Sequence, residues 1–201
     1  MQAPRREDPE AARGLLARVA LARLLARFPA RAVWAAFVLV NSFVTVGLLA
    51  GLAMVTGTPF VFPSLGPTAF LCFFTPTAAS ASPRNTLVGH GIGIVCGYGA
   101  LVVTGLEHAA AATAVGVDGP RIVAAALSLA CTGAGMVLLG VAHPPAGATT
   151  LIVSLGIVTR PADLLVIAAA VALLTAQAIA INRLAGIDYP LWTSKAAKGP
   201  S

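Results

Sequence analysis

His143-Pro144-Pro145-Ala146-Gly147-Ala148-Thr149-Thr150 places an imidazole, two prolines, a glycine and two hydroxyls in the middle of an apolar region. The surrounding residues 122–159 contain no Asp, Glu, Lys or Arg. Backbone N–H and C=O groups need partners in hydrocarbon, so such a break is tolerated only within protein or beside a water-filled cavity. The stretch therefore predicts an interrupted membrane segment with a functional site at the interruption.

The composition is that of an integral membrane protein that crosses the bilayer several times. Of the 201 residues, 58% are hydrophobic and 10% are charged, and the mean hydropathy is +0.89. A soluble domain carries about 25% charged residues. Residues 32–83 are also free of Asp, Glu, Lys and Arg, and a spanning helix needs about 20 apolar residues. A soluble protein is excluded.

The net charge of +6 lies mainly at the two ends of the sequence. Basic flanks stay cytoplasmic under the positive-inside rule, so we expect a bacterial inner membrane protein with both termini in the cytoplasm. A nucleic-acid partner is not expected, because the basic residues flank hydrophobic spans and form no recognition module. The flanking residues are Arg5, Arg6, Arg13, Arg18, Arg23, Arg27 and Arg31, followed after the last span by Arg183, Lys195 and Lys198.

Hydrophobic patterning divides the chain into an arm (1–31), one transmembrane domain (32–182) and a tail (183–201). In the arm, apolar residues recur with helical spacing from about Ala11 to Phe28, which predicts an amphipathic helix on the inner leaflet. The domain is predicted to be all-α, with two short segments between full-length spans. The full-length segments are Ala32 to Met54, Leu87 to Leu106, Ile122 to Val141 and Leu164 to Ile181; the short ones are Pro63 to Phe74 and Pro145 to Val158.

The two short segments are predicted to be half-helices of an internal duplication. Pro63-Ser64-Leu65-Gly66-Pro67-Thr68 and Pro144-Pro145-Ala146-Gly147-Ala148-Thr149 share the pattern P-x-x-G-x-T at an offset of 81 residues. The same offset places the first full span over the third and the second over the fourth. The copies would cover about 32–106 and 113–182. They are inverted if each short segment crosses the membrane and parallel if it re-enters, and the charges favour the inverted arrangement.

Half-helix N-termini present free N–H groups and the positive end of a helix dipole, which suits an anion. The second copy offers Gly147, Thr149 and Thr150, and the first offers Ser64, Gly66 and Thr68. If the two ends meet near the membrane midplane, they form an uncharged cage for a small anion. The alternative is that the hydroxyls cap helices and the glycines allow close packing.

Two histidines lie in the apolar regions. An ionisable residue within a membrane is a functional candidate, so His143 could bind a solute, carry a proton or gate a path. The alternative is a neutral imidazole bonded to a carbonyl freed by Pro144 and Pro145. We expect His90 to be a packing or mouth residue, and we place Asn41 on a polar pathway or in a hydrogen bond between helices.

Glycines recur every four residues along the second span. Gly89, Gly93 and Gly97 allow another backbone to approach closely, either within one subunit or in a dimer. Cys72, Cys96 and Cys131 have no C-x-x-C spacing and are expected to be small buried hydrophobes. No set of His, Cys, Asp and Glu has metal-ligand spacing, so neither a metal nor a cofactor is expected.

The string His143-Pro144-Pro145-Ala146-Gly147-Ala148-Thr149, with Pro63–Ala69 and Pro83-Arg84-Asn85, resembles the HPP family. That family is named for its His-Pro-Pro motif and is described as small integral membrane proteins with four spanning helices. The resemblance covers about residues 30–185. It implies small-anion transport, since plant organellar members are regarded as nitrite transporters, and it implies His143, Pro144, Pro145 and Gly147 as motif residues.

The leading hypothesis is therefore a membrane transporter or channel for a small inorganic anion, nitrite or nitrate first. The alternative is a non-transporting scaffold or assembly protein that associates through its glycine-rich helices. An enzyme fits poorly, because no carboxylate, nucleophile or metal set accompanies His143 in the sequence. The expected partners are the anion and the lipid bilayer, and a homodimer is left open.

Overall fold

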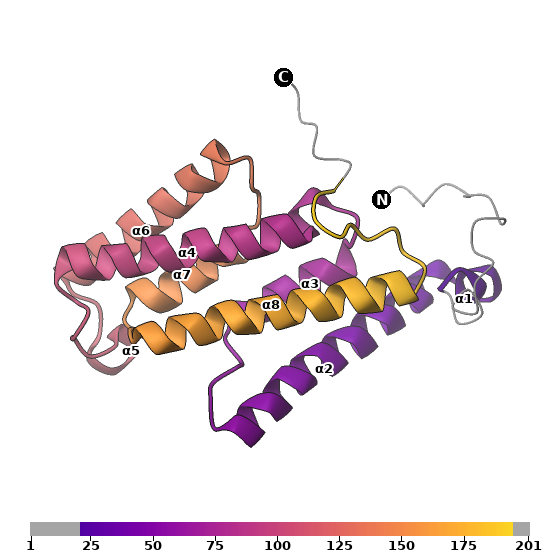
Figure 1. Ribbon diagram of the computed structural model, residues 1–201, viewed down its shortest axis with the longest axis horizontal. Coiled ribbons are helices and arrows are strands. Elements are labelled where there is room, and N and C mark those ends of the chain that lie inside the picture. The colour runs from indigo at the N-terminus through magenta and orange to yellow at the C-terminus, as the bar shows by residue number, and fades with distance from the viewer. Residues whose placement is uncertain (1–20, 195–201) are drawn as a thin grey trace.

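The computed structural model describes residues 21–194, and within that range the chain is built from helices joined by short connections (Figure 1). The predicted arm helix falls partly outside the described residues, which begin with α1. The helices are α1 (Leu21–Arg27), α2 (Ala30–Thr56), α3 (Leu65–Phe74), the 3₁₀ turn η2 (Ala79–Ala81), α4 (Pro83–Thr104), α5 (Ala112–Val115), α6 (Gly119–Leu138), α7 (Ala146–Ser154) and α8 (Pro161–Leu184).

Four of these helices, α2, α4, α6 and α8, are long and apolar enough to cross a membrane. Exposed side chains on α2 and α6 include Phe43 and Leu138, which are 78% and 85% exposed and suit contact with lipid. Helices α3 and α7 have 10 and 9 residues. At 1.5 Å per residue each covers about half of a bilayer core roughly 30 Å thick. The all-α, multi-pass membrane architecture predicted from the sequence is confirmed.

Helices α4 and α8 form the centre of the bundle. Helix α4 packs against α6, α7 and α8, while α8 packs against α2, α3 and α4. A shift of 81 in residue number places α2, α3 and α4 over α6, α7 and α8. Under this shift the contacts of α4 with α6 and α7 correspond to the contacts of α8 with α2 and α3, and the α4–α8 contact corresponds to itself. The short helices also bury equivalent positions, namely Leu65, Thr68, Ala69, Cys72 and Phe73 in α3 and Ala146, Thr149, Thr150, Val153 and Ser154 in α7.

The equivalent helices of the two halves run in opposite directions. Helix α4 begins beside the C-terminal segment, where the Arg84 N–H donates to the Trp192 carbonyl at 3.0 Å. It ends beside the start of α8, where Glu107 and Pro161 line one cleft. Helices α4 and α8 are therefore antiparallel, as Figure 1 also shows. This is the direction that inverted copies require, and parallel copies would not produce it.

Both ends of the described chain lie at one end of the bundle. The Leu21 N–H donates to the Ala185 carbonyl at 3.1 Å, which places α1 beside the end of α8. Figure 1 shows α2 leaving this end and the extended connection after it returning toward the middle, where α3 begins. The connection and α3 together carry the chain back across the bundle. Between α2 and α4, the extended segment and the short helix α3 thus take the place of a full-length span.

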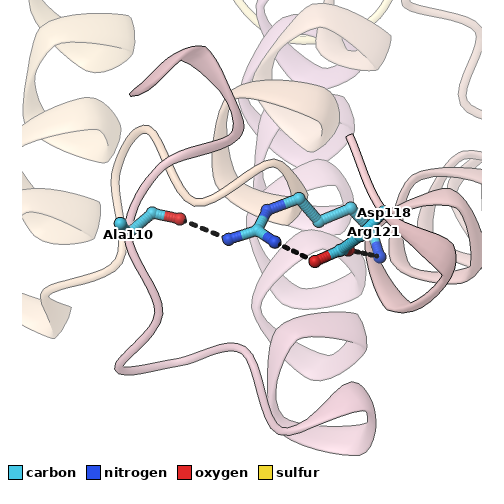
Figure 2. Close-up of polar contacts among 3 residues, drawn as sticks. All are labelled: Ala110, Asp118 and Arg121. Atoms are coloured by element: carbon cyan, nitrogen blue, oxygen red, sulfur yellow. Dashed lines mark hydrogen bonds and ion pairs between the residues drawn. The ribbon is translucent and has the colours of Figure 1, made fainter. Parts of the chain in front are cut away.

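At the opposite end, Arg121 ties the connection between the two halves to the start of α6 (Figure 2). Its guanidinium donates to the Ala110 carbonyl at 2.6 Å and forms an ion pair with Asp118. Asp118 also caps α6 by accepting from the Arg121 N–H at 3.0 Å. Arg121 is only 6% exposed, so its charge depends on these contacts.

The Arg121→Ala variant should therefore unfold at a lower temperature than the parent in detergent. It leaves the Ala110 carbonyl without its partner and removes the ion pair from Asp118, which keeps only the bond from the backbone N–H of residue 121, at a cost of about 1–3 kcal/mol. Arg160→Ala is the matched control, because Arg160 also pairs with an aspartate three residues away but its side chain is 78% exposed. The control should melt like the parent. Equal losses in the two variants would contradict this account of Arg121.

Candidate functional site

A pair of buried histidines lies at the centre of the structure. His90 comes from the middle of α4 and His143 from the connection before α7, yet their Nε2 atoms are 3.3 Å apart. Their ring centroids are 5.0 Å apart, and the two residues are 1% and 0% exposed. The structure thus gives His143 a histidine partner that the sequence analysis did not pair with it.

The two threonines of the P-x-x-G-x-T pattern bind opposite nitrogens of the same imidazole. Thr68 Oγ1, in the first turn of α3, lies 2.9 Å from His90 Nε2. Thr149 Oγ1, in the first turn of α7, lies 2.7 Å from His90 Nδ1. The N-terminal turns of the two short helices therefore meet at His90, which is the condition that the sequence analysis set for a shared site.

The partners of each group fix where the protons lie in the uncharged state. The Ser80 carbonyl can only accept, so His143 Nδ1 donates to it at 2.8 Å and His143 Nε2 is left as an acceptor. The Thr68 hydroxyl donates to the Ser64 carbonyl at 2.9 Å. Its oxygen can then accept from His90 Nε2–H. His90 Nδ1 accepts from Thr149, and the single His90 Nε2–H faces two acceptors, the Thr68 oxygen at 2.9 Å and His143 Nε2 at 3.3 Å.

The paired rings can accept one additional proton as a unit. In that state each Nδ1 donates outward, to Ser80 or to Thr149, and the proton lies between the two Nε2 atoms. A second proton would place two positive rings in contact and remove the bond between them. Within residues 21–194 neither ring is hydrogen-bonded to a charged side chain. The pair is thus an uncharged site that can hold a single positive charge.

Three glycines of α4 bring α7 and His143 close enough to form this pair. A Cβ atom at Gly89 would lie 2.8 Å from His143 Cβ, and one at Gly93 would lie 2.8 Å from the Ala146 carbonyl oxygen. At Gly97 it would lie 2.8 Å from the Thr150 carbonyl oxygen. The predicted close approach is therefore made within one subunit, along the whole length of α7.

The first turn of α7 does not offer free backbone donors to an anion. The N–H groups of Ala146, Gly147 and Ala148 donate to the carbonyls of the three preceding residues, at 3.0–3.1 Å. Pro144 and Pro145 carry no N–H at all. The backbone anion cage expected from the sequence is therefore not formed at α7, and the polar groups available at this position are side chains.

The other predicted site residues are divided among several contacts. Ser64 joins the pair only through its carbonyl, since its buried hydroxyl has no partner among residues 21–194. Thr150 bonds Thr132 of α6 at 2.9 Å, and Gly147 faces Leu129 of the same helix. Pro145 is buried and Pro144 exposed. Two residues do not reach the pair: Gly66 lines a crevice beside α2, and Asn41 donates to the Phe37 carbonyl of its own helix at 2.7 Å.

His90 is the functional candidate that sequence reasoning undervalued. Its position beside Gly89 and three residues before Gly93 was the available signal, because the glycine stripe is the face on which α7 packs. A polar residue at the edge of such a stripe is buried against the partner helix. The sequence could not show that the partner is the segment carrying His143, since 53 residues separate the two rings.

Comparison with known proteins identifies a family. The family model described as "HPP, transmembrane region" matches residues 28–190 of the chain. The match covers every long helix and both histidines of the pair. No curated protein and no solved structure shows significant similarity to the chain.

The close packing of α4 on α7 can be tested with a pair of alanine substitutions. Gly97→Ala should destabilise the protein by about 1–3 kcal/mol, because its Cβ would overlap the Thr150 carbonyl oxygen and the Val153 side chain. Gly99→Ala meets nothing within 4 Å and should leave stability unchanged or slightly raised. Thermal unfolding in detergent measures both. A stable Gly97→Ala protein would contradict the packing described for α7.

Proposed function

The chain belongs to the HPP family of membrane proteins, and from that premise we propose that it carries a small monovalent anion across the membrane. Nitrite is the first candidate and nitrate the second. The anion would bind at the His90–His143 pair, and the solute would not be chemically converted. The observation that carries the proposal is the buried, uncharged pair at the meeting point of two short helices.

The location of the pair supports a transport role. Polar groups within a membrane are costly, and they mark substrate or proton paths more often than other sites. The short helices meet in mid-bundle, where transporters with broken helices bind their solutes. The pair is fully buried, so a solute reaches it only when a neighbouring segment moves. A carrier that alternately opens its two ends fits this arrangement better than a permanently open channel.

The chemistry of the pair supports an anion that arrives with a proton. The protonated pair has a charge of +1, and the hydroxyls of Thr68 and Thr149 lie within hydrogen-bond distance of His90. An anion held there would have its charge neutralised without a fixed Lys or Arg. A small, planar anion of a weak acid, such as nitrite, meets this requirement.

The distribution of charge supports a cytoplasmic location for both described chain ends. Among residues 21–194, Asp188 is the acidic residue near that end. The opposite end combines Arg121 and Arg160 with three acidic residues, and both arginines form ion pairs with aspartates. The positive-inside rule then places the arginine-rich end in the cytoplasm, in keeping with a bacterial inner membrane. The basic residues at that end are Arg23, Arg27, Arg31, Arg84 and Arg183.

The alternative of a scaffold that associates through its glycine-rich helix has less support. Gly89, Gly93 and Gly97 are buried and face His143 and α7. A partner helix could use that stripe only by displacing α7 and taking the histidine pair apart. We therefore prefer transport to assembly.

Flux into proteoliposomes tests the proposal directly. Purified protein should admit nitrite faster than chloride or urea, in a panel that also contains nitrate and formate. Uptake should rise as the external pH falls, because the anion binds when the pair carries a proton. His143→Ala and His90→Ala should each lower nitrite uptake by at least about tenfold, which corresponds to about 1.4 kcal/mol.

His108→Ala is the matched control, because His108 is exposed and lies in the connection after α4. Its variant should transport like the parent. Parental uptake by the His143→Ala protein would refute the role of the pair. A parent protein that moves no member of the panel would refute anion transport itself.

A further inference from the structure

We propose that Arg84, assisted by Asn85, is a latch that closes the arginine-rich end of the protein over His143. In this view the segment 139–142, which joins α6 to His143, moves away when the latch opens and exposes the histidine pair to water from that end. The inference concerns access to His143 and does not depend on which solute is carried.

The first turn of α4 holds this segment by three hydrogen bonds. Arg84 Nη1 donates to the Gly140 carbonyl at 3.1 Å, and Nη2 donates to the Leu139 carbonyl at 3.0 Å. Asn85 Nδ2 donates to the Ala142 carbonyl at 3.3 Å. The last carbonyls of a helix have no partner within it, so the guanidinium also caps α6. Its two bonds end three residues before His143.

The opposite side of His143 is fixed more firmly. Its Nδ1 donates to the Ser80 carbonyl in η2, and the neighbouring Ala81 carbonyl accepts from the Tyr189 hydroxyl at 2.5 Å. Tyr189 is completely buried. Burial raises the pKa of its phenol, so the hydroxyl stays protonated and remains a donor. Turn η2 and the C-terminal segment thus form a fixed wall, and the exposed bonds of Arg84 are the ones that can release.

In the part of the chain that the structure describes, the other copy has no such latch. The positions 81 residues after Arg84 and Asn85 are Leu165 and Val166, whose side chains offer no hydrogen-bond donor, and Leu165 is 73% exposed. The matching connection before α3 is bounded by an apolar crevice of about 390 Å³. The crevice is lined by Val46, Leu49, Val61, Phe62, Pro63, Leu65 and Gly66. One end of the protein is therefore closed by polar bonds and the other by apolar packing.

Different closing contacts at the two ends of the protein allow each end to open separately. If both ends were closed by the same contacts, a change that loosened one would loosen the other, and the solute would leak through. Arg84 acts at one end only, and water can replace its bonds because both bonds lie in exposed positions on a half-buried residue.

Acylation of histidines by diethyl pyrocarbonate, followed by peptide mass spectrometry, measures the opening in full-length protein in nanodiscs. The chain has three histidines, and exposed His108 is an internal reference. In the parent, His143 should react far more slowly than His108. In Arg84→Ala the ratio of the His143 rate to the His108 rate should rise at least about tenfold, equivalent to about 1.4 kcal/mol of lost closure. Arg84→Lys, which keeps the charge but not the two-pronged contact, should give an intermediate ratio.

Arg160→Ala removes an exposed arginine from the opposite end and should leave the ratio at its parental value. If Arg84→Ala melts like the parent and His143 remains unreactive, Arg84 is only a helix cap and the latch is overturned. If Arg84→Ala fails to fold, the same acylation measurement on Asn85→Ala tests the latch, since that variant removes only the hydrogen bond to the Ala142 carbonyl. A raised ratio in that variant supports the latch, and a parental ratio overturns it.

Discussion

The hydrogen bonding of the His90 imidazole to two threonines 81 residues apart is the interaction on which the rest of the structure depends. In hydrocarbon a polar ring must find all its partners inside the protein. Thr68, Thr149 and His143 supply them, and together they bring the two short helices and α4 to one point. The buried imidazole is stable only in the arrangement in which all three of these partners are in place, because a half-satisfied polar network is less stable than an apolar core.

The two halves of the chain meet at this ring without being equivalent. Both contribute a threonine at the same place in the P-x-x-G-x-T pattern, but His90 and His143 come from positions whose counterparts, Val171 and Phe62, are apolar. The connection before α7 is held by Arg84 and Asn85, while the one before α3 is packed against apolar side chains. An approximately symmetric frame thus carries an asymmetric site. Such a frame can open toward one side of a membrane at a time.

The sequence predicted the spans closely, because length and hydropathy are local properties. The expected span Leu164 to Ile181 is Pro161–Leu184 in the structure, and the short segment from Pro145 becomes α7. The site was harder to predict. His90 and His143 are brought together by packing of α4 on α7, which no local pattern encodes. The first turn of α7 has no free backbone N–H for the predicted anion cage, because adjacent turn carbonyls already accept those N–H groups. Asn41 looked like a pathway residue, but a mid-helix amide can equally bond its own backbone.

Nitrogen-15 NMR of the histidine-labelled protein in bilayers is the most direct test of the central claim, which is that His90 and His143 act as one hydrogen-bonded pair. Only three histidines contribute to the spectrum. We predict that His143 carries its proton on Nδ1 and that a cross-peak joins the Nε2 atoms of the two buried rings. His108 should instead show the exchange-averaged signal of a solvated imidazole. Three separate, averaged imidazoles with no contact between Nε2 atoms would contradict the account.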